Sequence, residues 1–231
     1  MSFAATLVRL TQAPGLVIAA VRMAVAVLLL TPFFLLTWRR RLAELRSKRT
    51  LLLVAASGFF LALHFWSWIE SLARTSITSS VLLVTMSPIF VTVASVMLFH
   101  EGAGLRTLAS IALGITGALI ITLGKGPGSQ SLATGTNMTS LSGKLLAVVG
   151  GIMASAYWLI GRRVRQALTI LSYAYVTYLV AALVLMLMVV LTGERLTGYT
   201  RTSYLYLALL ALGPQVLGHT SFNWALRHVT A

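Results

Sequence analysis

The stretch Gly15–Thr37, GLVIAAVRMAVAVLLLTPFFLLT, decides the fold because it is almost continuously apolar and carries a single charged residue, Arg22. A helix needs about 20 such residues to cross the hydrocarbon core of a bilayer. The run lacks the strict apolar–polar alternation of a membrane barrel strand, so it is predicted to be a transmembrane α-helix.

Similar apolar runs follow along the whole chain, separated by short polar turns. Counting the first, the sequence predicts seven spans, at Gly15–Thr37, Leu51–Ala73, Ile77–Phe99, Leu105–Gly124, Lys144–Gly161, Ile170–Leu191 and Ser203–Ala225. The apolar segment Met1–Val8 is too short to cross and is interpreted as the end of a preceding helix. We therefore expect an all-α integral membrane protein.

The composition supports this class and excludes others. Of the 231 residues, 58% are hydrophobic and only 10% are charged, and the mean hydropathy is +0.91, which is too apolar for a soluble domain. The absence of Cys and Asp and the four scattered His argue against thiolate chemistry, a metal cluster or a Ser-His-Asp triad. No phosphate-binding loop of the Walker type occurs, so neither an ATP-driven pump nor a bound cofactor is expected.

The net charge of +14 is explained by membrane topology. Eleven basic residues fall on one side of the predicted spans and six on the other, and the positive-inside rule makes the richer side cytoplasmic. The dense group between 39 and 49 is expected to face anionic lipid, so the bilayer rather than a nucleic acid is the expected partner.

An internal repeat relates the two halves of the chain. A shift of 155 residues brings Gly58 onto Gly213 and His64 onto His219, and it lays the first span on the sixth. An offset of five spans is odd, so the halves are inverted, as in many secondary transporters that bind substrate at the repeat interface. The Gly- and Ser-rich stretch 125–143 is the predicted linker between them.

Several short motifs resemble the EamA family of the drug/metabolite transporter superfamily. They are Ala20-Val21-Arg22-Met23-Ala24, Leu30-Thr31-Pro32, His64-Phe65-Trp66-Ser67-Trp68, Ser79-Ser80-Val81-Leu82, Ser87-Pro88-Ile89-Phe90 and His100-Glu101. The resemblance implies a ten-helix inner-membrane carrier of small metabolites, such as amino acids or drug-like compounds, built from two inverted five-helix repeats. On this reading 1–124 holds part of helix 1 and helices 2–5, 125–143 is a periplasmic linker, and 144–231 holds helices 6–8.

The polar residues within the spans are the candidates for the substrate cavity. Arg22 lies about 10 Å into its span, where it either binds an anion at the cavity or snorkels outward. Gln215, His219 and Asn223 follow one another at intervals of four residues and form one row on a helix face. The complete set of expected cavity residues is Arg22, His64, Trp68, Ser80, Pro88, Tyr157, Gln215, His219 and Asn223.

His64 and Glu70 are the candidates for coupling transport to a proton or another ion. His64 could carry protons, although in a helix bundle such a group more often makes interhelical hydrogen bonds. Glu70 is the only acid within a span, and it is either a proton or cation site or the partner of Arg74 four residues later. We prefer the surface ion pair for Glu70.

These observations favour a carrier, with efflux as the expected direction, in the inner membrane of a bacterium. Two alternatives stay open at this stage, namely a truncated membrane protein or scaffold that transports nothing, and an intramembrane enzyme using His64, His219 and Glu70. The sequence also leaves open whether the chain forms a homodimer.

Overall fold

The computed structural model of the protein describes residues 2–99, 104–123 and 140–227. Every regular element in these ranges is helical. The elements are α1 (Ser2–Leu10), α2 (Gly15–Leu36), α3 (Trp38–Glu44), α4 (Lys48–Arg74), α5 (Ile77–Thr85), α6 (Ser87–Phe99), α7 (Leu105–Leu123), α8 (Leu141–Val164), α9 (Ile170–Thr192), α10 (Arg201–Leu210), the π-helix η2 (Ala211–His219) and α11 (Thr220–Ala225).

Five of the seven expected spans are helices long and apolar enough to cross a membrane within the described ranges. They are Gly15–Leu36, Lys48–Arg74, Ile77–Met97, Leu141–Val164 and Ile170–Thr192. The other two expected spans are helical but do not meet that standard as single helices. In one, only the shorter apolar helix Leu105–Gly117 is found, and the other is divided among α10, η2 and α11.

Several helix starts follow from local sequence. Ser76, Thr169 and Thr200 each precede a helix, and the side chain of each accepts a hydrogen bond from the backbone N–H three residues later. Such caps satisfy backbone donors that would otherwise lack a partner. At the other end of α9, Gly193 adopts a left-handed conformation with φ of 71°, which glycine allows without strain.

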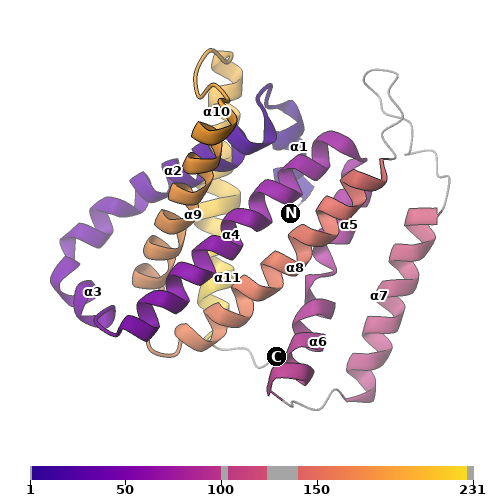
Figure 1. The fold of residues 1–231 in the computed structure, drawn as a ribbon, viewed down its shortest axis with the longest axis horizontal. Coiled ribbons are helices and arrows are strands. Elements are labelled where there is room, and N and C mark those ends of the chain that lie inside the picture. Colours follow the sequence, from indigo (N-terminus) through magenta and orange to yellow (C-terminus); the bar gives the residue numbers. More distant parts are fainter. Residues whose placement is uncertain (1, 100–103, 124–139, 228–231) are drawn as a thin grey trace.

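The helix α4 is the centre of the bundle. It packs along α8 and α9 and also contacts α2, while α2 lies against α9 and η2. Figure 1 shows α4 and α8 side by side, with α7 at the edge of the molecule. Large apolar side chains such as Leu36, Leu187 and Val190 remain exposed on the outside, as expected for helices surrounded by lipid.

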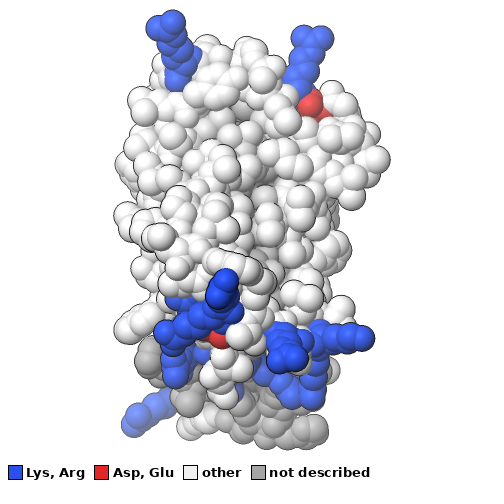
Figure 2. Space-filling model, turned by 90° about the vertical axis from the view of Figure 1, so that its left-hand side faces the viewer, with Lys and Arg blue, Asp and Glu red and all other residues white. Residues whose placement is uncertain are grey.

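The charged residues occupy the two ends of the molecule. Figure 2 shows most of the Lys and Arg side chains gathered at one end, few at the other, and uncharged side chains between them. We call the richer end, which contains α3 and the last turn of α8, the basic end. The unequal numbers of Lys and Arg side chains at the two ends agree with the unequal division of basic residues between the two sides of the spans expected from the sequence.

The two halves of the chain contact each other at the basic end through Glu44. Its carboxylate accepts hydrogen bonds from the backbone N–H and the hydroxyl of Thr169, at 3.1 and 2.9 Å, and pairs with Arg41 at 3.4 Å. Burial raises the pKa of Glu44, but hydrogen bonds from Ser172 and Thr169 and the charge of Arg41 outweigh it, so the pKa lies below its ordinary value. The carboxylate also lies at the N-terminus of α9, where a negative charge is favourable.

The lowered pKa predicts how Glu44 contributes to stability. Its stabilisation is present above the ordinary pKa of 4.5 and is lost as pH falls below it. Glu44→Gln should therefore lower the thermal unfolding midpoint of the purified protein at pH 7 and reduce the further loss on acidification to pH 4. Glu70→Gln, at a partly exposed surface pair, is the control. Equal midpoints of Glu44→Gln and wild type at pH 7 would contradict this account.

The close approach of α4 and α9 gives a second prediction. A Cβ atom at Gly58 would lie 2.7 Å from the carbonyl oxygen of Thr177, whereas one at Gly117 on α7 would meet nothing within 4 Å. Gly58→Ala should destabilise the protein by about 1–3 kcal/mol through overpacking. Thermal unfolding in detergent measures this. Gly117→Ala is the matched control and should unfold at or slightly above the wild-type midpoint because alanine favours the helix.

Candidate functional site

Arg22 lies at the centre of the candidate site. Its side chain is 0% exposed, because α2 presents it inward, towards α4 and η2. Its Nη2 donates a hydrogen bond to Oε1 of Gln215 at 2.8 Å, and its guanidinium lies 4.1 Å from the ring centroid of Phe65. Arg22 is therefore turned into the bundle, and it does not snorkel to the surface.

The charge of Arg22 is only partly compensated. No ion pair within the described residues includes it, and its Nε and Nη1 have no hydrogen-bond partner there. The amide of Gln215 and the face of Phe65 supply a dipole and a cation–π contact, which stabilise a buried cation less than an acid does. The structure thus holds a buried positive charge with unused donors.

Two histidines flank this group. The Nδ1 of His64 donates to the carbonyl oxygen of Gly150 at 2.8 Å, and its ring stacks on Trp68 with 6.2 Å between centroids. The ring of His219 lies 6.2 Å from that of His64 and meets Phe65 edge-on at 4.9 Å. His64 and His219, which are 155 positions apart in sequence, are thus neighbours in space.

A small cavity adjoins these groups. Its volume is about 110 Å³, and the residues that line it are Phe3, Ala4, Arg22, Trp68, Pro214, Gly218, His219 and Phe222. We call it the central cavity. It is well below the roughly 300–1,000 Å³ of pockets for drug-sized ligands, so in this conformation it accommodates only a small molecule or one end of a larger one.

The π-helix η2 positions one wall of the central cavity. Its fourth residue, Pro214, has no N–H, so the regular α-helical bonding pattern cannot continue through it. Such widened turns occur frequently at functional sites. Gln215 and His219 are both buried in η2, and the row expected from the sequence continues with the buried Asn223 in α11.

Tyr157 and Asn223 belong to a second buried cluster further along this row. The Tyr157 hydroxyl donates to Oδ1 of Asn223, whose Nδ2 donates to the Tyr178 hydroxyl at 3.4 Å. Arg165, at the basic end of α8, donates to the backbone carbonyl of Asn223 at 3.0 Å. We call Tyr157, Tyr178 and Asn223 the tyrosine cluster. Its hydrogen bonds join α8, α9 and α11 between the central cavity and the basic end.

The other candidates lie apart from the central cavity. Ser80 is buried at the contact of α5 with α4, where its hydroxyl shares a hydrogen bond of 2.6 Å with Ser71. Glu70 forms the expected ion pair with Arg74, at 2.8 Å. His100 and Glu101 lie outside the described residues.

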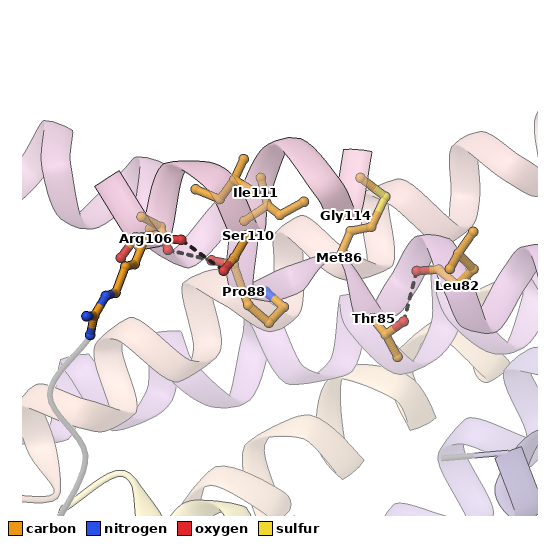
Figure 3. Close-up of a pocket in the computed structure, with 11 residues that line it drawn as sticks. Leu82, Thr85, Met86, Pro88, Arg106, Ser110, Ile111 and Gly114 are labelled. Atoms are coloured by element: carbon orange, nitrogen blue, oxygen red, sulfur yellow. Dashed lines mark hydrogen bonds between the residues drawn. The ribbon is translucent and has the colours of Figure 1, made fainter. Parts of the chain in front are cut away.

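Pro88 lines a different and larger hollow, between α5–α6 and α7. It is an open groove of about 460 Å³, whose hydroxyl groups are shown in Figure 3. Thr85, Thr92 and Ser110 all donate to carbonyls of their own helices, so these hydroxyls have no free donor for a ligand. Pro88 instead marks the break between α5 and α6, as expected from its missing N–H.

Phe65, Tyr178 and Phe222 were not identified from the sequence. Phe65 contacts both Arg22 and His219, Tyr178 contacts Asn223, and Phe222 lines the central cavity. Their only sequence signal is proximity to polar residues on the same helix, because an aromatic residue in an apolar span is equally suited to lipid. The described residues contain no group of three His, Cys, Asp or Glu that could hold a metal ion.

Comparison with known proteins identifies the family. A family model described as the EamA-like transporter family matches residues 1–123 and 141–231. The chain belongs to this family. As an EamA-like protein it is a multi-pass membrane protein of the drug/metabolite transporter type, and proteins of this family are transporters.

The remaining comparisons concern the fold of this EamA-like chain. A solved crystal structure, described only as that of a protein, superposes with a TM-score of 0.65 and 17% identity, covering 97% of this chain and 74% of that chain. At this identity the match shows a shared fold alone. No curated protein matches the chain.

The bond between Arg22 and Gln215 predicts a measurable coupling. Gln215→Leu leaves the buried guanidinium without its amide partner and should destabilise the protein by about 1–3 kcal/mol, whereas replacing both residues by Leu should cost less than the two single changes together. Chemical denaturation of the four proteins in detergent measures the coupling. Gln215→Leu combined with Ser110→Ala on the distant α7 should be additive, and additivity of the Arg22–Gln215 pair would contradict the prediction.

Proposed function

We propose that the protein is a carrier that moves a small metabolite across the bilayer by alternating access, with the central cavity as its substrate site. The observation that carries this proposal is the composition of the cavity wall. Residues of α1, α2 and α4 lie on one side and residues of η2 and α11 on the other, so the two halves of the chain meet at the cavity. A site between halves can exchange its exposure when the halves move relative to each other.

An inverted repeat, with a first unit over 1–124, a linker over 125–143 and a second unit over 144–231, belongs to the same proposal. It is supported by the contact between His64 and His219, which are equivalent in the two units. The hydrogen bond from Arg22 to Gln215 also joins the units, across 193 positions of sequence. Contacts of this kind lie near the symmetry axis of a two-fold repeat.

The proposed orientation places the basic end in the cytoplasm of a bacterial cell and the protein in the inner membrane, according to the positive-inside rule. In this orientation the tyrosine cluster would lie on the cytoplasmic side of the central cavity, because Arg165 at the basic end bonds to Asn223. Efflux remains the proposed direction. Proton coupling through His64 stays a prediction. Because Nδ1 of His64 donates to the carbonyl oxygen of Gly150, Nε2 is the nitrogen that would accept the proton.

Transport in proteoliposomes tests the proposal. Gly218 lines the central cavity, whereas Gly213 on the same π-helix does not, and neither has a close neighbour that would clash with a Cβ. Gly218→Leu should reduce the uptake of labelled substrates, drawn from a panel of amino acids, organic acids and nucleosides, to near background. Gly213→Leu should retain the wild-type rate.

Two results would overturn the proposal. One is the absence of transport of the whole panel by folded wild-type protein in either direction. The other is equal transport by the two glycine variants, which would show that the substrate does not pass through the central cavity. Chemical conversion of a substrate without net movement would favour an intramembrane enzyme instead.

A further inference from the structure

We infer that the ligand of the central cavity is a small organic monocarboxylate, held by Arg22 and Trp68. The inference rests on the proposed function in that it names the substrate class of the same cavity. Its basis is the set of buried hydrogen-bonding atoms that have no partner within the described residues and belong to side chains lining the cavity.

The unused atoms of Arg22 and Trp68 are all donors. Nε and Nη1 of Arg22, Nε1 of Trp68 and Nδ1 of His219 are buried and have no partner within the described residues, and the imidazole nitrogen donates or accepts according to its tautomer. A guanidinium and an indole can donate hydrogen bonds but cannot accept them. A buried donor without a partner costs free energy, so this wall is completed by a ligand that supplies acceptors.

The single positive charge of Arg22 at the cavity wall favours a ligand with one negative charge. Among the residues that line the cavity, Arg22 is the single cationic side chain of fixed charge, and no acid is among them. A ligand with one negative charge neutralises it, whereas a phosphate dianion or a dicarboxylate would leave a second charge buried without a partner. A carboxylate also has the two oxygens that a guanidinium binds well.

Gln215 acts as a positioning residue in this arrangement. Its Oε1 accepts from Nη2 of Arg22, and Phe65 lies against the guanidinium. These contacts hold the guanidinium in place while leaving Nε and Nη1 free. The arrangement is therefore organised before a ligand arrives, which reduces the entropy lost on binding.

The rest of the cavity limits the size and polarity of the ligand. Phe3, Ala4, Pro214 and Phe222 supply apolar surface, and the volume is only about 110 Å³. A short hydrocarbon chain fits this surface. No carboxylate is among the lining residues, so the wall offers no charged partner for an ammonium group.

Binding to the purified protein tests this inference without relying on transport. The probes are butyrate and its neutral isostere butyramide, and the readout is the shift of the thermal unfolding midpoint with probe concentration. Butyrate should stabilise the wild-type protein and butyramide should not. Arg22→Gln should weaken the apparent affinity for butyrate about tenfold or more, as expected for loss of a charged hydrogen bond.

Two further variants keep the test decisive. Arg163→Gln removes an exposed guanidinium at the basic end and should retain the butyrate response, which controls for net charge. Trp68→Phe keeps an aromatic ring but removes the Nε1 donor, and it should weaken butyrate binding even if Arg22→Gln does not fold. 2-Aminobutyrate, which adds an ammonium group, should bind more weakly than butyrate.

Three outcomes would overturn the inference. They are equal stabilisation by butyrate and butyramide, retention of the butyrate response in a folded Arg22→Gln or Trp68→Phe protein, and no response to any carboxylate. Transport of a neutral solute that Gly218→Leu abolishes would then leave the carrier function standing with a different substrate. Failure of both experiments would remove the carrier proposal as well.

Discussion

The buried charge of Arg22 is the constraint on which the arrangement of the site depends. A charged side chain within a span costs at least about 2.5–3.5 kcal/mol unless its surroundings compensate it. Here the compensation comes from the opposite half of the chain through Gln215 and from α4 through Phe65. Holding one guanidinium therefore requires α2, α4 and η2 to meet at the same depth in the bilayer.

The surroundings of Arg22 differ in how completely their polar groups are paired. The tyrosine cluster is a continuous hydrogen-bonded layer that also fixes Arg165. The central cavity leaves donors of Arg22 and Trp68 unused. Buried polar groups are normally paired, so this contrast separates a layer that is structural from a wall that is prepared for a ligand.

The sequence predicts most of the fold because long apolar runs in a membrane have little choice but to form helices. Arg22, His64, Gln215, His219 and Asn223 could be identified because a polar residue within such a run needs an internal partner. The burial of all five agrees with that reasoning. The sequence also predicts the break at Pro88, whose missing N–H interrupts any helix.

Other features were not accessible to sequence reasoning. Phe65 is as apolar as its lipid-facing neighbours, so nothing in the pattern distinguishes its contact with Arg22. The hydroxyl of Ser80 bonds with Ser71 and lies apart from the cavity, which depends on how α4 and α5 pack and not on spacing. The short helix α3, within the basic segment, places Glu44 on α9 through a contact 125 positions distant in sequence.

The π-helix η2 also has a mechanical consequence. Hydrogen bonds in a π-helix span one more residue than those in an α-helix, so each π turn stores an extra residue within the length of the helix. Returning the turns after Pro214 to α-helical bonding would rotate Gln215 and His219 relative to α10. A change of hydrogen-bonding register in this π-helix therefore turns His219, which lines the central cavity, relative to the other half of the chain.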